Sequence, residues 1–261
     1  MTPALHDMIS DTFEQLRRQK EMALIPYLTA GFPALDESIE LIAGMADNGA
    51  DIVEVGVPFG DPVADGPTIQ HASEVALAQG ARLIDILHAL RAANIPKPVV
   101  LMSYLNPLMA YPQGRLFKDM KDAGVSGLIV PDLPPEEAQG WLAEARANGV
   151  NLILLVAPTS SDERVRQISD CCDTFLYYVT VTGITGARRS LPEDLTDSLQ
   201  RVRRIAQKPV VAGFGISDAR QVRALRGHAH GVVVGSRIVE AVRQGEDLTE
   251  LIKNLKQATR S

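Results

Sequence analysis

The chain has 261 residues, of which 46% are apolar and 22% charged, which is enough material for a sizeable hydrophobic core. Its formal net charge of −6 argues against nucleic acid or an anionic membrane as the main partner. No apolar run approaches the ~18 residues of a membrane span, and the polar N-terminus lacks a signal-peptide core, so we expect a cytoplasmic protein.

Cysteine and histidine usage indicates neither a disulfide framework nor a metal site. Cys171 and Cys172 are adjacent, and a disulfide between neighbours is strained, so we expect two reduced thiols. No carboxylate or cysteine joins the five histidines at ligand spacing. We therefore predict no bound metal.

The first predicted element is a helix over 7–18, which has apolar residues at helical spacing and basic residues in its last turn. Because it precedes the first strand, we expect it to cap one end of the core. Short apolar runs, typical of strands buried on both faces, then recur along the chain. They cover 23–29, the start of 51–67, 98–103, 126–131, 151–157, 174–179, 209–212 and 231–234.

Helical patterns alternate with these strands. The predicted helices cover 36–48, 67–79, 82–93, 113–123, 135–148, 161–168, 195–206 and 247–257, with short helical patterns after the last two strands. Eight strands alternating with helices and no internal linker predict one domain, a closed (β/α)8 barrel over 21–261 with an extra N-terminal helix over 1–20. An open doubly wound sheet is the alternative.

Common nucleotide-binding motifs are absent. Gly213 and Gly215 begin a GxG pattern, but Asp218 stands where the dinucleotide fingerprint requires its third glycine. No GxxxxGK motif occurs either. The sequence therefore indicates neither NAD nor nucleoside triphosphate binding.

The segment 51–67, DIVEVGVPFGDPVADGP, carries the strongest chemical signal. Glu54 lies inside an apolar run, where an ionised carboxylate is costly unless it is paired or functional. Asp65, eleven residues later, follows in a loop rich in glycine and proline. These two carboxylates are the acid/base candidates. Alternatively, Glu54 is a salt-bridged core residue and Asp65 a helix N-cap.

A phosphate site is expected after the last two strands, where barrels of this kind often hold one. Gly213 and Gly215 let backbone N–H groups approach an anion. Gly235 and Ser236 stand at a helix N-terminus, which attracts phosphate. The alternative is that these residues only form tight turns.

The sixth strand and the loop after it contribute further candidates. Tyr177 and Tyr178 lie on opposite sides of the pleat, so one faces the barrel and the other the helices. The polar, glycine-bearing segment 180–190 suits a lid that excludes water, or else is a plain surface loop.

Several segments resemble the tryptophan synthase alpha subunit family. EVGVPFGDPVADGPTIQ (54–70) is similar to the family signature, and the similarity continues in LMSYLNP (101–107), GLIVPDLPPEE (127–137), VTGITG (181–186), AGFGIS (212–217) and VVVGSRIV (232–239). The resemblance covers essentially the whole chain. It implies retro-aldol cleavage of indole-3-glycerol phosphate to indole and glyceraldehyde 3-phosphate, with no cofactor or metal in this chain.

The resemblance also assigns roles to residues. It implies that Glu54 moves the protons, that Asp65 stays ionised and accepts the indole N–H, and that Tyr177 orients the substrate. The remaining binding positions that it implies are Phe214, Gly215, Gly235 and Ser236 for the phosphate, Thr185 and Gly186 for the lid, and Tyr27, Met102 and Ile129 for the indole pocket.

The family partner is a pyridoxal-phosphate beta subunit in an α2β2 heterotetramer, which receives indole through a tunnel. The resemblance implies that loops at 61–62, 106–107 and 134–135 face this partner. It also implies allosteric linkage, in which the lid and the loop after the second strand close when ligands bind.

Three alternatives remain to be weighed. A stand-alone lyase releasing free indole would use the same residues. A phosphate-binding isomerase of histidine-biosynthesis type would need paired aspartates after strands one and five, where this chain has Thr29 and Ala157. A non-catalytic subunit would not need both Glu54 and Asp65.

Overall fold

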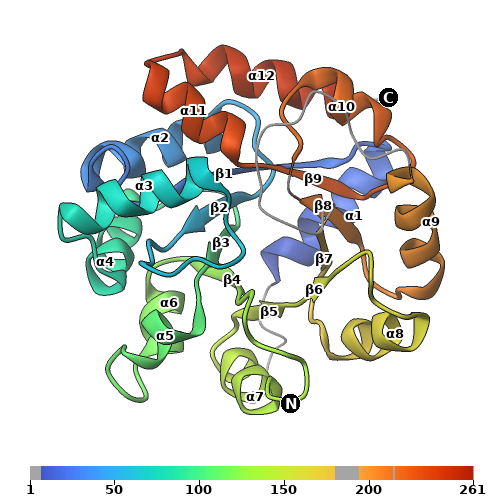
Figure 1. The fold of residues 1–261 in the computed structure, drawn as a ribbon, viewed down its shortest axis with the longest axis horizontal. Helices are drawn as coiled ribbons and strands as arrows, with labels where there is room; N and C mark the ends of the chain where they lie inside the picture. Colours follow the sequence, from blue (N-terminus) through green and yellow to red (C-terminus); the bar gives the residue numbers. More distant parts are fainter. Residues whose placement is uncertain (1–6, 180–193, 214, 261) are drawn as a thin grey trace.

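Parallel strands form the centre of the molecule, and helices surround them (Figure 1). The computed structural model describes residues 7–179, 194–213 and 215–260. The strands are β1 (Ala23–Thr29), β2 (Val53–Gly56), β3 (Val99–Met102), β4 (Val125–Ile129), β5 (Asn151–Ile153), β6 (Leu155–Val156), β7 (Leu176–Val179), β8 (Val210–Gly213) and β9 (Gly231–Val234).

Helices occupy the connections between strands and pack outside them. They are α1 (Met8–Gln19), α2 (Leu35–Asp47), α3 (Pro67–Ala78), α4 (Leu83–Ala93), α5 (Leu105–Met109), α6 (Leu116–Asp122), α7 (Gln139–Ala147), α8 (Asp162–Cys171), α9 (Leu195–Ile205), α10 (Ala219–Ala224), α11 (Ser236–Gln244) and α12 (Leu248–Thr259). Among the described residues, none of these helices has the length and apolarity needed to cross a membrane.

The sheet closes on itself, as the barrel prediction requires. Its order is β5-β4-β3-β2-β1-β9-β8-β7-β6, and all its pairings are parallel. β5 and β6 are the two halves of the strand predicted over 151–157, with Leu154 between them. β5 pairs with β4, β6 pairs with β7, and the Leu154 carbonyl accepts a hydrogen bond from Tyr177 N–H at 3.0 Å. The alternative of an open sheet is therefore wrong.

Burial follows the expectation for a parallel barrel. All seven residues of β1 are buried, since one face of each strand points into the barrel and the other toward the helices. Tyr177 lies inside the barrel near Glu54, whereas Tyr178 reaches Ser198 and Arg201 of α9. The opposite orientation predicted for these two tyrosines is confirmed.

Some predicted boundaries are wrong for local reasons. The helix expected over 113–123 begins only at Leu116. The helix expected over 135–148 begins at Gln139, because the chain first forms turns that return to the carbonyls of Pro134 and Pro135. α5 was not predicted, since five residues are too few to show a helical period. Both cysteines are free thiols, as expected.

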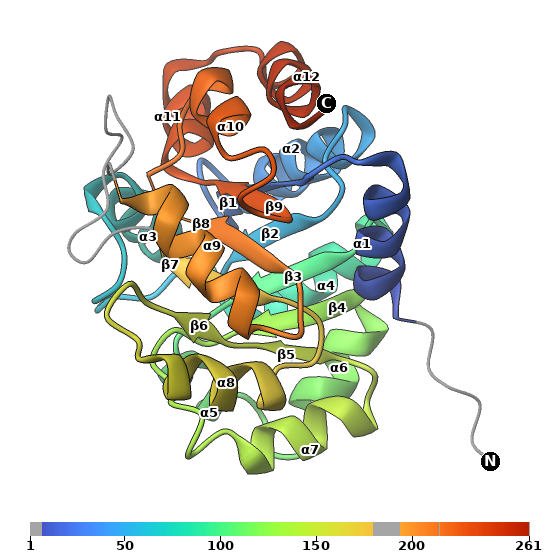
Figure 2. The same ribbon diagram turned by 90° about the vertical axis from the view of Figure 1, so that its right-hand side faces the viewer.

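α1 lies across the N-terminal ends of the strands (Figure 2). Its apolar face is buried, and the rings of Phe13 and Phe175 lie 5.4 Å apart. Asp7 caps the helix by accepting from the backbone N–H groups of Ile9 and Ser10, and it also accepts from Asn151 at the start of β5. α1 therefore covers this end of the core.

A buried ionic cluster attaches α12 to the same end of the barrel. The Lys256 ammonium lies 2.9 Å from Asp51 Oδ2 and 3.0 Å from Glu21 Oε2. Asp51 also accepts a hydrogen bond from Leu24 N–H in β1 at 2.8 Å. One cation thus joins the last helix to the segments before β1 and β2.

Candidate active site

Glu54 projects from β2 into the barrel, opposite Tyr27 in the register with β1. Its side chain is buried, and its Oε1 atom has no hydrogen-bond partner. Burial, and secondarily the charge of Asp65, raise the pKa of Glu54 to about 8. The alternative of a salt-bridged core carboxylate does not hold, because no ion pair to Glu54 occurs within the described ranges.

Asp65 lies in the turn between β2 and α3 and is also buried. Burial raises its pKa to about 6, and a hydrogen bond from Tyr104 opposes that rise. The N-cap of α3 is Gly66, and no side chain caps this helix. Asp65 is therefore not the helix cap that the alternative interpretation required, and its carboxylate is available for chemistry beside Glu54.

Tyr104 is a site residue that the sequence analysis missed. It follows β3, it is buried, and its hydroxyl oxygen accepts the Ala64 N–H at 3.0 Å while bonding the Asp65 carboxylate. Burial and the Asp65 charge raise the pKa of Tyr104, so it stays a neutral donor. The available signal was its position at the end of a strand, where barrel enzymes place their functional groups.

Two glycines make room for the tyrosines that face Glu54. A Cβ atom at Gly56 would lie 2.0 Å from the hydroxyl oxygen of Tyr27, and one at Gly213 would lie 2.2 Å from the ring of Tyr177. Both rings therefore cross the barrel over positions that tolerate no side chain. Burial raises the pKa of both hydroxyls, so each is neutral.

These side chains surround a small cavity of about 30 Å³. Its lining residues are Tyr27, Glu54, Asp65, Ile69, Met102, Tyr177, Gly215, Val233, Gly235 and Ser236. Ile69 and Val233 were not predicted, because both look like ordinary core residues in the sequence. Any organic substrate must widen this space by moving side chains or loops.

Most of the predicted site residues converge on this cavity. Ile129 does not line it; it lies buried in β4, opposite Met102 in the register. Phe214, Thr185 and Gly186 lie outside the described residues. Their roles stay predictions.

The N-terminus of α11 opens onto the same cavity. Gly235 is its N-cap, and no side chain occupies the first turn as a cap. Exposed amides and the helix dipole make such an end attractive to an anion. Gly215 lies nearby with φ +78°, a conformation that favours glycine. No group of three or more potential metal ligands occurs in the part of the chain that the structure describes.

A closed parallel barrel with two carboxyl groups of unequal pKa at the C-terminal ends of its strands defines a barrel enzyme of the acid–base type. Comparison with known proteins identifies which one. Residues 13–261 match the family model described as tryptophan synthase alpha chain. The chain belongs to the tryptophan synthase alpha chain family, and is thus a lyase of tryptophan biosynthesis.

Individual relatives agree with this assignment. The tryptophan synthase alpha chain of Roseiflexus castenholzii is 48% identical, over 90% of this chain and 92% of that protein. The tryptophan synthase alpha chain of Aquifex aeolicus is 42% identical, over 97% of this chain and 98% of that protein. A structure of Mycobacterium tuberculosis tryptophan synthase superposes with a TM-score of 0.91 at 36% identity, covering 97% and 98%. The structure of tryptophan synthase subunit alpha from Legionella pneumophila superposes with a TM-score of 0.87 at 32% identity, and it covers the same shares of the two chains.

Proposed function

We propose that Glu54 is the proton donor and acceptor in the cleavage of indole-3-glycerol phosphate to indole and glyceraldehyde 3-phosphate. The observation that carries this proposal is the buried, unpartnered Oε1 atom of Glu54, whose raised pKa keeps the carboxyl protonated near neutrality. A polar atom left unsatisfied in a barrel interior is costly, and a substrate group in the cavity would satisfy it.

The protons and electrons of the reaction balance with one carboxyl group. Glu54 donates its proton to C3 of the indole ring, and the positive charge is carried on the ring nitrogen. The resulting carboxylate takes the proton of the neighbouring hydroxyl, whose O–H electrons form the aldehyde C=O. The bond between C3 and the glycerol carbon breaks, and its electron pair restores the indole ring. Glu54 ends protonated, ready for another turnover.

Asp65 complements this step as a fixed negative charge. Its lower pKa leaves it ionised near pH 7, so it accepts the indole N–H and stabilises the charge developing on the nitrogen. Tyr104 positions it, since one hydroxyl joins the Asp65 carboxylate to the adjacent Ala64 backbone. Tyr177, Tyr27 and Met102 hold the substrate against the two acids.

The substrate phosphate would bind where α11 begins. Gly215, Gly235 and Ser236 line the cavity, and the uncapped first turn of α11 supports an anion site there. Phe214 is proposed to complete this site, with Thr185 and Gly186 closing over it and Ile129 backing the indole pocket.

The assembly proposed for this chain follows its family. We infer that it acts as one cytoplasmic domain without a cofactor of its own, in an α2β2 complex with a beta subunit that carries pyridoxal phosphate. The loops at 61–62 and 134–135 and the first turn of α5 at 106–107 are the proposed contacts. A stand-alone lyase is not favoured, since the compared relatives are tryptophan synthase chains.

The test is indole release by the Glu54→Gln variant. Glutamine keeps the shape of the side chain but neither donates nor accepts a proton as a carboxyl group does. We therefore expect the rate of indole release to fall by about 10³-fold or more. Glu74→Gln, on the exposed side of α3, is the matched control and should retain full activity. A Glu54→Gln enzyme with near wild-type turnover would refute the assigned role. Adding a beta subunit should accelerate release by the wild type.

A further inference from the structure

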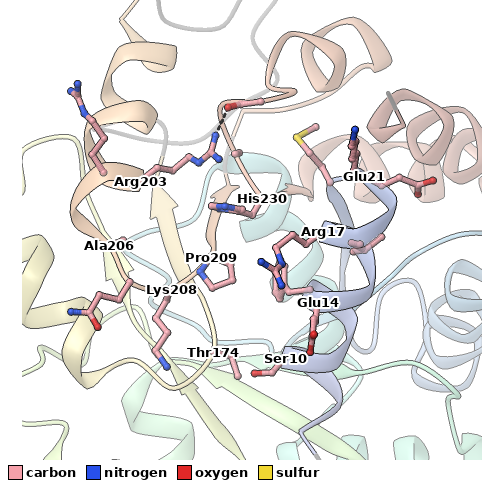
Figure 3. Close-up of a pocket in the computed structure, with 18 of the residues that line it drawn as sticks. Ser10, Glu14, Arg17, Glu21, Thr174, Arg203, Ala206, Lys208, Pro209 and His230 are labelled. Carbon is pink, nitrogen blue, oxygen red and sulfur yellow. Dashed lines mark hydrogen bonds between the residues drawn. The ribbon is translucent and has the colours of Figure 1, made fainter.

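A second, larger cavity lies at the opposite end of the barrel from the proposed active site. It is a groove of about 870 Å³ between α1 and the segments that lead into β7, β8 and β9 (Figure 3). Its apolar walls include Phe13, Leu16 and Pro209. Nothing in the proposed reaction uses this groove, so its composition calls for a separate explanation.

The acidic residues of the groove are already neutralised from outside it. Glu14 pairs with Arg18, Glu21 with Lys256 and Arg260, and Asp173 with Arg146. None of these four cations lines the groove. The three carboxylates therefore do not offset the positive charge of the groove's own basic residues.

Four basic residues of the groove have no carboxylate partner among the described residues. Within the described ranges, no ion pair engages Arg17, Arg203, Arg204 or Lys208. Arg203 donates to the Gly227 carbonyl and Lys208 to the Asp173 carbonyl at 2.9 Å, which orients both side chains without neutralising them. The groove is thus a concentration of unpaired positive charge over an apolar floor.

Two further polar groups point to a missing ligand. His230 Nδ1 accepts the Val210 N–H at 2.9 Å, so Nε2 carries the proton of the neutral ring. Figure 3 shows this ring extending into the groove between Arg203 and Arg17. Thr174, which also lines the groove, is 3% exposed, and its hydroxyl oxygen has no hydrogen-bond partner. Buried polar groups of this kind are normally satisfied.

We propose that this groove binds a small organic anion with an apolar body. Arg17 and Arg203, whose side chains lie on either side of His230 in Figure 3, hold the anionic head, since guanidinium groups match the geometry of carboxylate and phosphate oxygens. The apolar body packs against Phe13, Leu16 and Pro209. Because the ligand touches both α1 and the barrel, its binding stabilises the folded chain, by an amount that grows with the logarithm of its concentration above the dissociation constant.

The test uses the full chain and 3-phenylpropionate as the probe, followed by ¹H–¹⁵N correlation spectra. We expect saturable shifts at amides of α1 and of the segments preceding β8 and β9, with no matching change around Glu54. The uncharged analogue 3-phenylpropanamide should bind at least about tenfold more weakly, a difference of about 1.4 kcal/mol.

Charge-removing variants make the proposal specific. Arg17→Gln and Arg203→Gln should each raise the dissociation constant about tenfold. Arg223 is an exposed residue of α10 outside the groove. The Arg223→Gln variant makes the same change of charge and should leave the dissociation constant unaltered. Arg17 is exposed on α1, so its variant should fold even if Arg203→Gln does not. Equal binding of acid and amide, or unchanged affinity in Arg17→Gln, would overturn the proposal.

Discussion

Glu54 and Asp65 have the same functional group, but their surroundings give them different proton affinities. Glu54 is fully buried with an unpartnered oxygen, and the charge of Asp65 lies nearby; burial first, and that charge second, hold its pKa at about 8. Asp65 keeps a hydrogen bond from Tyr104, and its pKa stays at about 6. Pairs of titratable groups with separated pKa values are how one site supplies an acid and an anion at the same pH.

The pH dependence of catalysis should report these two values. Because Glu54 must be protonated and Asp65 ionised, we expect kcat/KM for indole release to be bell-shaped, falling below about pH 6 and above about pH 8. Steady-state assays across this range would measure it. A rate that keeps rising above pH 8 would contradict the role of Glu54 as the initial acid.

The same shift predicts a pH-dependent stability. The folded-state pKa of Glu54 lies above its ordinary value of about 4.5 in an unfolded chain, so its stabilising effect is complete below that pH and is lost as pH rises through 8. Glu54→Gln removes this loss. We therefore expect its free energy of unfolding, relative to wild type, to increase between pH 5 and pH 9 by about 4 kcal/mol. Urea unfolding at both pH values would show no such divergence if Glu54 were solvated.

Tyr104→Phe tests the positioning of Asp65. Without the hydroxyl, the Asp65 carboxylate loses a hydrogen bond that lowers its pKa, so the acidic limb of the profile should move to higher pH. We expect the rate near neutrality to fall about tenfold. Tyr111→Phe, which removes a hydroxyl bonded to Asp119 outside the cavity, is the control. If the rate fell but the acidic limb of the pH profile stayed in place, Tyr104 would only support packing.

At the scale of elements, strands were easier to predict than their connections. Buried parallel strands are almost continuously apolar, so β1 and β9 have the bounds expected from the sequence. The interruption at Leu154 depends on pairing with two different neighbours, β4 and β7, which no local pattern encodes. Glu54 was detectable because a carboxylate in such a run is unusual, whereas Tyr104, Ile69 and Val233 have residue types common in any core.

The attachment of α12 gives a prediction at this scale. Lys256→Met would leave Asp51 and Glu21 in a largely buried place without their shared cation, although Glu21 keeps Arg260. Removing one partner of a buried ion pair typically costs about 3–5 kcal/mol. Chemical denaturation should detect this loss, and Lys253→Met, exposed on the same helix, should change stability by less than about 0.5 kcal/mol. Equal effects would show that the cluster adds nothing specific.

At the scale of the whole molecule, the large exposed apolar side chains bear on the proposed partner. Val63 and Met109 are 76% and 67% exposed, and both lie in connections at the active-site end, which the Ala64–Tyr104 hydrogen bond joins. Interface cores are depleted in charged residues. We expect Val63→Asp with Met109→Glu to weaken beta-subunit binding by about tenfold or more, measured by calorimetry.

A matched substitution separates docking from general surface effects. Met8→Glu places a charge on a 38% exposed methionine of α1, at the other end of the barrel. It should leave affinity for the beta subunit unchanged. Equal affinity of the Val63/Met109 double variant and wild type would place the interface elsewhere.

The position of α1 also bears on how the chain folds during synthesis. α1 leaves the ribosome before the barrel strands, yet its capping residue bonds to Asn151, 144 positions later, and the ring of Phe13 packs against that of Phe175. α1 also contacts β1 and β4, but until about two thirds of the chain has emerged the surface that buries its apolar face lacks Asn151 and Phe175. For most of translation the nascent chain therefore carries a helix whose apolar face is only partly covered, which offers a binding site for chaperones.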